Sequence, residues 1–321
     1  MSVLVTGSIA IDQIMVFPDK FLNHILPDKI HTLNVAFMVP ELKRQWGGTG
    51  ANIAYNLRRL GVDPILLGTV GHDFGAYAEW MDRHGVRRDH VRVLDDCFTA
   101  QCFITTDLDN NQITSFHSGA MDRAHEAAIG AVSHPIRVGI VAPNGKRAMV
   151  ENARWLKQRG IPCVVDPGQG LPMFEPRELI ELLDGASVYV VNDYEWALTL
   201  EKTGLDEEGI AARVGAVVVT RGEKGSRVRR GGHEALVRME RESTEVPTVK
   251  PERVVDPTGC GDAYRAGILY AMLQDMSLED GARLGSLLGS LKVARSGPQS
   301  IEIGAAELRA IFAREFGQPL R

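Results

Sequence analysis

Short runs of valine, isoleucine and leucine recur along the chain and predict the strands of a buried sheet. The runs are at residues 3–5, 65–67, 138–142, 163–165, 188–191 and 217–219. Continuous apolar runs of this length are typical of strands covered on both faces, as in parallel sheets. Amphipathic segments lie among them, at 51–60, 146–159 and 206–214. This alternation predicts an α/β fold in which helices flank a central, mostly parallel sheet.

The segment 14–46 departs from this rhythm. It holds alternating or turn-rich pieces, at 14–17 and 33–39, without a helical period. We therefore expect a small β-sheet lid inserted at about 14–46, with a contribution from about 98–118. The last third is more helical, with apolar residues at three- and four-residue spacing at 260–273, 278–294 and 304–316. Because no internal repeat or low-complexity tract is present, the sequence predicts one domain, 1–321, that carries the lid.

Composition and charge argue against nucleic acids and membranes as partners. The 321 residues are 44% hydrophobic and 24% charged, near the averages of globular proteins. A net charge of −5 gives no broad positive field, so we expect neither a nucleic-acid nor a membrane partner. Without a signal-peptide pattern or an apolar stretch that could span a bilayer, the expected location is cytoplasmic. The cysteines are scattered with no CxxC pair, which argues against a zinc site or a disulfide framework: Cys97, Cys102, Cys163 and Cys260.

The most informative stretch is at 256–267, where Asp-Pro-Thr-Gly-Cys-Gly-Asp-Ala-Tyr-Arg-Ala-Gly opens a predicted helix. Gly259 and Gly261 flank one small residue, Cys260, so successive backbone N–H groups can converge on an anion at the positive end of the helix. A carboxylate in such a nest would repel phosphate, so we interpret Asp262 as a general base that faces a hydroxyl nucleophile. The alternative is an ordinary helix N-terminus in which Asp262 only interacts with the helix dipole.

Asn192 and Glu195 form a second candidate site, because they follow an apolar run at the expected carboxyl end of a strand. Open α/β folds place ligands at that edge of the sheet. Two oxygen-bearing side chains there can hold waters around Mg²⁺, which keeps much of its hydration shell when it binds phosphates. The alternative is a helix cap in which Asn192 or Asp193 accepts from N–H groups of the first turn.

These motifs resemble those of the ribokinase, or PfkB, carbohydrate kinases. The stretch 256–262 resembles the family signature D-T-x-G-A-G-D, with Pro257 in the Thr slot and Cys260 in place of Ala. Three further stretches resemble, in order, the family's N-terminal signature, its N-x-x-E element and its T-x-G-x-x-G nucleotide loop: 47–54, 192–195 and 220–225. The resemblance covers essentially the whole chain and implies a ribokinase-like α/β fold with a small β-sheet lid.

The resemblance also implies cofactors and roles for the phosphoryl side. It implies ATP as co-substrate, Mg²⁺ as cofactor, and a candidate K⁺ site near Asp256 and the 295–301 loop. Asp262 would be the base, with the N–H groups at 259–261 stabilising the moving phosphoryl. The implied contacts to nucleotide or metal are Asn192, Thr220, Gly222 and Gly225 for ATP, and Asn192 and Glu195 for Mg²⁺. Lids of this family are free or pair in a dimer, so both a monomer and a homodimer through the lid are expected.

On the substrate side, the resemblance implies that Asp12 binds sugar hydroxyls, since a carboxylate can accept from two neighbouring hydroxyls. Gly48 would let the backbone approach the sugar, and the Asn52 amide can both donate and accept. The plainer alternatives are a turn residue for Asp12 and a helix N-cap for Asn52.

The choice of sugar rests on a further resemblance, to the bacterial adenosine kinase branch. The opening at 6–12, with Ser8 among its substrate-binding residues, resembles that branch, as do 17–18, Phe37, 105–107, 115–121, 166–169, 192–196 and 264–267. The resemblance implies phosphorylation of the adenosine 5′-hydroxyl to give AMP and ADP, within purine salvage. It places Phe116 on the purine, Gln169 in the pocket and Phe37 in the closing lid. Stacking of a base on Phe needs no base-specific hydrogen bond.

One departure and two alternatives accompany this choice. Cys102 stands where the branch often has a second aromatic, and Phe103 beside it would point to the opposite face of a regular strand. Phe116 and Phe103 are alternatively core residues. A kinase for a free sugar or sugar phosphate is the first alternative function, although the basic pair at 43–44 fits a solvated edge equally well. A non-catalytic nucleoside-binding regulator is the second, but such a binder needs no base at 262.

Overall fold

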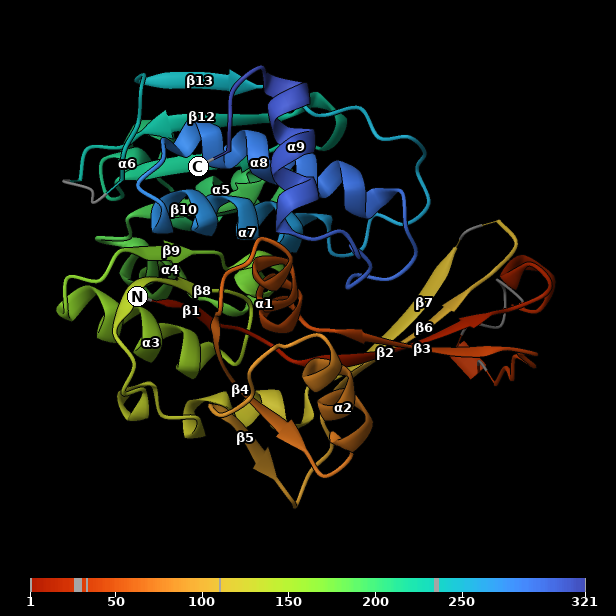
Figure 1. Ribbon diagram of the computed structural model, residues 1–321. Helices are drawn as coiled ribbons and strands as arrows, with labels where there is room; N and C mark the ends of the chain where they lie inside the picture. Colours follow the sequence, from red (N-terminus) through yellow and green to blue (C-terminus); the bar gives the residue numbers. More distant parts are fainter. Residues whose placement is uncertain (1, 26–30, 33, 110, 234–236, 321) are drawn as a thin grey trace.

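The computed structural model describes residues 2–25, 31–32, 34–109, 111–233 and 237–320. Within these ranges the strands form a nine-stranded sheet, in the order β13-β12-β11-β10-β9-β8-β1-β4-β5, and a separate four-stranded sheet, in the order β3-β2-β6-β7. Figure 1 shows the four-stranded sheet projecting from the side of the large α/β body. We call this smaller sheet the lid.

The large sheet is parallel except at one edge, where β11–β12 and β12–β13 pair antiparallel. Its strands are β1 (Ser2–Thr6), β4 (Ile65–Gly71), β5 (Val91–Leu94), β8 (Ile136–Val141), β9 (Cys163–Val165), β10 (Val188–Asn192), β11 (Ala216–Thr220), β12 (Ser226–Arg230) and β13 (Ser243–Val246). The apolar runs named from the sequence coincide with these strands, except that the run at 138–142 extends one residue past Val141, the end of β8. The predicted α/β fold with a central, mostly parallel sheet is therefore confirmed.

Alternate residues of the central strands point into two different cores, one on each face of the sheet. Val3 and Val5 belong to the core covered by α1, α2, α7, α8 and α9, whereas Leu4 belongs to the core under α3, α4, α5 and α6. The helices are α1 (Thr49–Arg59), α2 (Gly75–Arg83), α3 (Lys146–Gln158), α4 (Pro176–Leu183), α5 (Asp193–Thr203), α6 (Glu207–Ala211), α7 (Cys260–Leu273), α8 (Leu278–Val293) and α9 (Ala305–Phe316). Among the described residues, no helix is long and apolar enough to cross a bilayer.

The lid is built from two pieces of chain that are distant in sequence. It comprises β2 (Ala10–Val16), β3 (Leu42–Gly47), β6 (Ala100–Thr106) and β7 (Gln112–His117). β2 follows β1 directly, pairs antiparallel with β3 and pairs parallel with β6. The lid sheet thus starts at Ala10, a few residues before the predicted insertion.

Two predicted elements differ from the structure. The alternating piece at 33–39 forms no strand over 34–39, the part that the structure describes; the lid strand is at 42–47. The helix predicted at 206–214 is shorter, because only α6, Glu207–Ala211, is α-helical. The N–H groups of Arg213 and Val214 donate to carbonyls three residues back, as in a 3-10 turn, and the chain then enters β11.

Candidate active site

Unpaired backbone N–H groups gather at the N-terminus of α7 in the described part of the chain. Gly259 precedes the helix with a φ of 80°, and a Cβ there would lie 2.7 Å from Cβ of Pro298, so only glycine fits. Among the described residues, the N–H groups of Gly259, Gly261 and Asp262 donate to no protein acceptor. The Cys260 N–H, which was also expected in this site, instead donates to the Pro257 carbonyl at 3.1 Å. We call the three free N–H groups the anion site.

Asp262 lies in the first turn of α7 and is partly exposed. Burial raises the pKa of its carboxyl to about 7, the Asp166 and Asp12 carboxylates raise it further, and Asn52 and Arg265 act in the opposite direction. Its Oδ2 accepts a hydrogen bond from Nδ2 of Asn52 at 2.8 Å. A carboxylate with a pKa near neutrality suits a general base.

Asn52 connects Asp262 to a network that the sequence did not reveal. Asn52 is inside α1, whose N-cap is Gly48, so the predicted alternative of a helix cap does not apply to it. Its Oδ1 accepts from Nε2 of Gln299 at 3.1 Å. Gln299 in turn contacts the Tyr77 hydroxyl at 2.6 Å and accepts from Nε1 of Trp80 at 2.9 Å. No local pattern indicates this network, because its members come from three separate parts of the chain.

The lid presents Asp12 and Phe116 on the same face. Asp12 pairs with Cys102 across β2 and β6, and Cys102 pairs with Phe116 across β6 and β7, so the three side chains form one row. Phe103 pairs with Gln13 in the adjacent row and points to the opposite face, as predicted. The Phe116 side chain is 54% exposed, which excludes the alternative of a core residue.

Two glycines shape the backbone beside Asp12. A Cβ at Gly47 would lie 2.6 Å from Oδ2 of Asp12, and a Cβ at Gly48, where φ is 90°, would lie 2.5 Å from the Ser8 carbonyl oxygen. Burial raises the pKa of Asp12 to about 6, with a smaller contribution from the Asp256 carboxylate. Ser8 Oγ accepts from the Thr49 N–H at 3.0 Å and so holds the start of α1.

Phe37 lies outside the lid strands, and its ring centroid is 4.8 Å from that of Phe17 and 4.9 Å from that of Phe21. Gln169 is exposed in a short 3-10 helix, Gly168–Met173, that follows β9. The structure thus leaves the Gln169 amide free to face solvent or a ligand at the carboxyl end of the large sheet.

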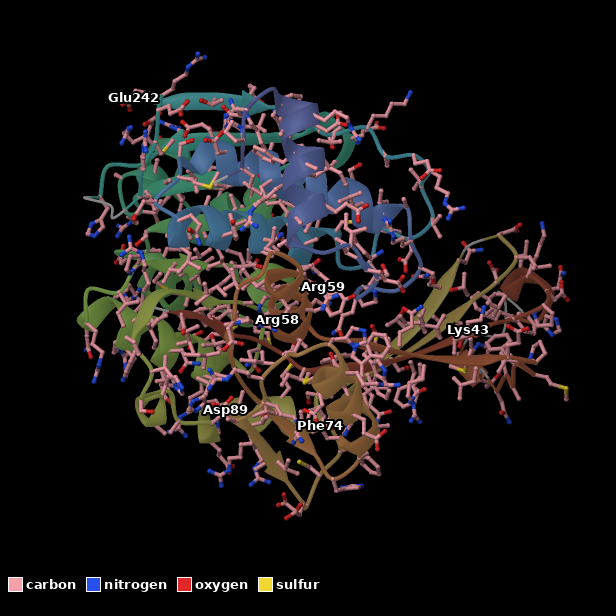
Figure 2. All side chains as sticks on the ribbon, viewed as in Figure 1. Lys43, Arg58, Arg59, Phe74, Asp89 and Glu242 are labelled. Atoms are coloured by element: carbon pink, nitrogen blue, oxygen red, sulfur yellow. The ribbon has the colours of Figure 1, made fainter. Side chains whose placement is uncertain are left out.

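The basic pair at 43–44 does not form one cluster. Lys43 pairs with Ile14 and Arg44 with Gln13 across β3 and β2, so their side chains leave opposite faces of the lid. Figure 2 shows Lys43 on the projecting lid, and its ammonium group lies 3.6 Å from the Glu41 carboxylate. This arrangement is that of a solvated edge.

Asn192 and Glu195 cap α5, as the alternative interpretation held. Asn192 Oδ1 accepts from the Glu195 N–H at 2.8 Å, and Glu195 Oε2 accepts from the Asn192 N–H at 2.9 Å. Glu195 also lies 3.9 Å from the guanidinium of Arg265, which makes two hydrogen bonds to Asp166. Burial and the Asp166 carboxylate together raise the pKa of Glu195.

The cluster of Asp166, Glu195 and Arg265 fits a divalent cation. Its hydrogen bonds to one another and to the start of α5 also account for these residues without a cation. Two buried carboxylates, Asp166 and Glu195, share the single positive charge of Arg265, so negative charge is in excess. A Mg²⁺ ion held through water would reduce that excess. Sequence reasoning did not identify the Asp166–Arg265 pair, whose members are 99 residues apart.

The loop after β11 leaves part of its backbone open to a ligand. Thr220 ends the strand and its hydroxyl donates to the Val191 carbonyl at 3.4 Å. Gly225, with a φ of 80°, would bring a Cβ to 2.1 Å from the Val246 carbonyl oxygen. Gly222, with a φ of 55°, has open space where a side chain would be, so a ligand can approach its backbone.

An α/β body with a β lid, polar residues after β9, β10 and β11, and a carboxylate beside unpaired backbone N–H groups at the start of α7 are typical of a phosphotransferase of the ribokinase-like class. The model of the pfkB family carbohydrate kinases matches residues 6–303. The chain therefore belongs to the PfkB family of carbohydrate kinases, as the sequence motifs predicted.

Solved structures and curated relatives agree with this assignment. The structure of Burkholderia thailandensis nucleoside kinase in complex with inosine is 42% identical, with a TM-score of 0.86, and the match covers 99% of this chain and 100% of that chain. A structure of the same protein with ADP and inosine has a TM-score of 0.84 at 44% identity, covering 100% of this chain and 98% of that chain. The Methanocaldococcus jannaschii nucleoside kinase is 29% identical over 285 residues, 85% of this chain and 87% of that protein. The Bacillus subtilis ribokinase is 24% identical over 258 residues, 79% and 83% respectively.

The K⁺ site that the family resemblance implied does not fit the residues present. Near Asp256 and the 295–301 loop, Lys292 Nζ donates to the carbonyl oxygens of Asp256, at 2.8 Å, and Arg295, at 3.0 Å. Two carbonyl oxygens of this region, the kind of ligand that holds a K⁺ ion, are therefore already bound to an amine of this chain.

Proposed function

We propose that this protein is a Mg·ATP-dependent nucleoside kinase that phosphorylates the 5′-hydroxyl of purine ribonucleosides, adenosine among them. The observation that carries the proposal is the 2.8 Å hydrogen bond from Asn52 to Asp262, which joins the predicted ribose-binding residues to the predicted base. The inosine and ADP complexes of the B. thailandensis relative support a nucleoside acceptor and an adenine nucleotide.

The reaction follows from the placement of the chain's own groups. The ribose lies under the lid against Asp12, Gly48 and Asn52, so that its 5′-hydroxyl faces Asp262. Asp262 takes the hydroxyl proton as the oxygen attacks the γ-phosphorus of ATP, and the bond to the ADP oxygen breaks in line. The N–H groups of the anion site stabilise charge on the moving phosphoryl. The products are ADP and a nucleoside 5′-monophosphate.

ATP lies over the 220–225 loop, where Thr220, Gly222 and Gly225 shape the backbone. Glu195 and Asn192 would hold the waters of Mg²⁺, which when bound neutralises charge on the ATP phosphates. The excess negative charge of the Asp166–Arg265–Glu195 cluster supports this position.

The purine ring of the nucleoside is recognised by stacking more than by fixed hydrogen bonds. Phe116 extends from the Asp12 face of the lid, and Phe37 packs against Phe17, just beyond the end of β2. The Gln169 amide can both donate and accept, which suits a 6-amino or a 6-oxo purine. These features support adenosine and inosine equally as acceptors, and lid closure would exclude the water that hydrolyses ATP.

A substrate panel tests the proposal. ADP release would be measured with adenosine, inosine, pyrimidine nucleosides, ribose and fructose 6-phosphate, and the product would be identified as a 5′-monophosphate. We expect a higher kcat/KM for purine nucleosides than for ribose. A preference for ribose would favour the free-sugar kinase, and saturable nucleoside binding without turnover would favour the regulator.

A further inference from the structure

Lys292 is a fully buried lysine whose partners are backbone carbonyls. It lies in the last turn of α8, and its side chain is among the largest that are fully buried. Lysine is almost never fully buried unless it is paired. Here the amine donates to the carbonyl oxygens of Asp256 and Arg295. Rings of carbonyl oxygens are the ligands by which proteins hold a dehydrated K⁺ ion.

The two carbonyls belong to the loops that build the anion site. Asp256 opens the glycine-rich run, and its carboxylate accepts from the N–H groups of Thr258, at 2.9 Å, and Gly297, at 2.8 Å. Arg295 begins the loop that places Pro298 against Gly259. The Lys292 amine therefore connects the loop that begins at Asp256 to the loop that begins at Arg295.

The loop that begins at Arg295 is also connected to Asp262, the proposed general base. Gln299 follows Pro298 and donates to Asn52, which donates to Asp262. A shift of the 295–299 loop would thus displace both the anion site and the hydrogen bond that orients Asp262. Catalysis is sensitive to such shifts, since a misplacement of about 1 Å can cost about 100-fold in rate.

The surroundings of the Lys292 amine act on its charge in both directions. Burial lowers the pKa of Lys292, whereas the Asp256 carboxylate and Cys260 act in the opposite direction. Two carbonyl acceptors favour the protonated amine, and a mobile cation beside it would be repelled.

We propose that the Lys292 ammonium takes the place of a monovalent cation beneath the anion site, so that phosphoryl transfer by this protein needs no added K⁺. Lys292 is a positioning residue, because it acts through the two loops and touches no reacting atom. The inference rests on the proposed kinase function for its rate measurement, and a thermal measurement tests it independently.

The experiment compares KCl with tetramethylammonium chloride at about 0.1 M, so that ionic strength is constant. The wild-type protein, Lys292→Ala and Lys292→Met are assayed for kcat with the best nucleoside of the panel. Lys157→Met is the matched control, because Lys157 Nζ also donates to backbone carbonyls, those of Glu181, Leu182 and Asp184, at the far end of α3.

We expect wild type and Lys157→Met to show the same kcat in both salts. Both Lys292 variants should lose about 100-fold in kcat without K⁺. Lys292→Ala, which leaves room for an ion, should recover activity in KCl or NH₄Cl, whereas Lys292→Met should not. KCl should also raise the melting temperature of Lys292→Ala relative to tetramethylammonium chloride, without doing so for wild type.

Activation of the wild-type kcat by KCl, or a K⁺-specific rise in its melting temperature, would overturn the proposal. So would a Lys292→Ala variant that keeps full activity without K⁺. The wild-type comparison decides the matter even if the variants do not fold. Absence of any nucleoside phosphorylation by wild type would refute the proposed function instead, and the melting temperatures would still test the role of Lys292.

Discussion

Asn52 Nδ2 donates to Asp262 Oδ2 at 2.8 Å, although 210 residues separate the two in the chain. Asn52 is buried in α1 beside the lid, and Asp262 lies in the first turn of α7 beside the free N–H groups of Gly259 and Gly261. The bond thus holds Asp262, the proposed general base, between the place expected for a ribose and the place expected for a phosphate.

The stacking role predicts a substrate-selective effect of Phe116→Ala. Loss of a base–aromatic stack costs about 1–3 kcal/mol, so KM for adenosine or inosine should rise about 5- to 150-fold. KM for ribose, which has no base, should not change. Phe103→Ala is the control, because Phe103 is 40% exposed but leaves the opposite face of the lid. Equal effects of the two variants on nucleoside KM would refute the stacking assignment.

Gly47→Ala should weaken binding of the sugar. The new Cβ would lie 2.6 Å from Oδ2 of Asp12, so the carboxylate must move away from its position. We expect KM to rise for every ribose-containing acceptor while KM for ATP stays constant. Gly75→Ala is the control, since its Cβ would meet nothing within 4 Å. Steady-state kinetics with each substrate varied in turn would show the difference.

Asp166→Asn should destabilise the fold and the site together. The variant leaves Arg265, which is buried, without its bidentate partner, at a cost of about 3–5 kcal/mol in the free energy of unfolding. Glu151→Gln, which removes the exposed i,i+4 pair with Arg147, should cost at most about 1 kcal/mol. Urea unfolding measures both, and similar costs would contradict the buried-pair account.

The raised pKa of Asp262 predicts an unusual dependence of stability on pH. Burial raises the folded-state pKa from 3.8 to about 7, so folding favours the protonated carboxyl. The stability from this group is complete below the unfolded pKa and is lost as pH rises through the folded pKa. Asp262→Asn removes that loss, so its melting temperature relative to wild type should increase between about pH 5 and about pH 8. A difference that stays constant over this range would show that the carboxyl titrates normally.

The sequence predicted the sheet well because its signal is local. Runs such as 217–219 are apolar in every residue, since each strand is covered on both faces, and the structure places Val217 and Val218 in opposite cores. The signal of the glycine nest was also local, because Gly259, Cys260 and Gly261 are consecutive in the chain.

The predictions that failed, and the residues that were missed, depend on tertiary contacts. The 33–39 piece alternates like a strand, yet Phe37 packs between Phe17 and Phe21 outside any strand. The Asp166–Arg265 pair and the bond from Gln299 to Asn52 join residues 99 and 247 positions apart. Such pairs leave no periodic pattern that sequence reasoning could recognise.

The most direct test of the account is the kcat of Asp262→Asn with a purine nucleoside, measured beside wild type across pH. The amide can keep the contact with Asn52 but cannot take the proton, so kcat should fall about 10²–10⁴-fold with little change in nucleoside KM. Wild-type kcat/KM should decline as pH falls through about 7, because the base becomes protonated. If Asp262→Asn turned over nucleosides at the wild-type rate, Asp262 would not be the base and the proposed mechanism would be wrong.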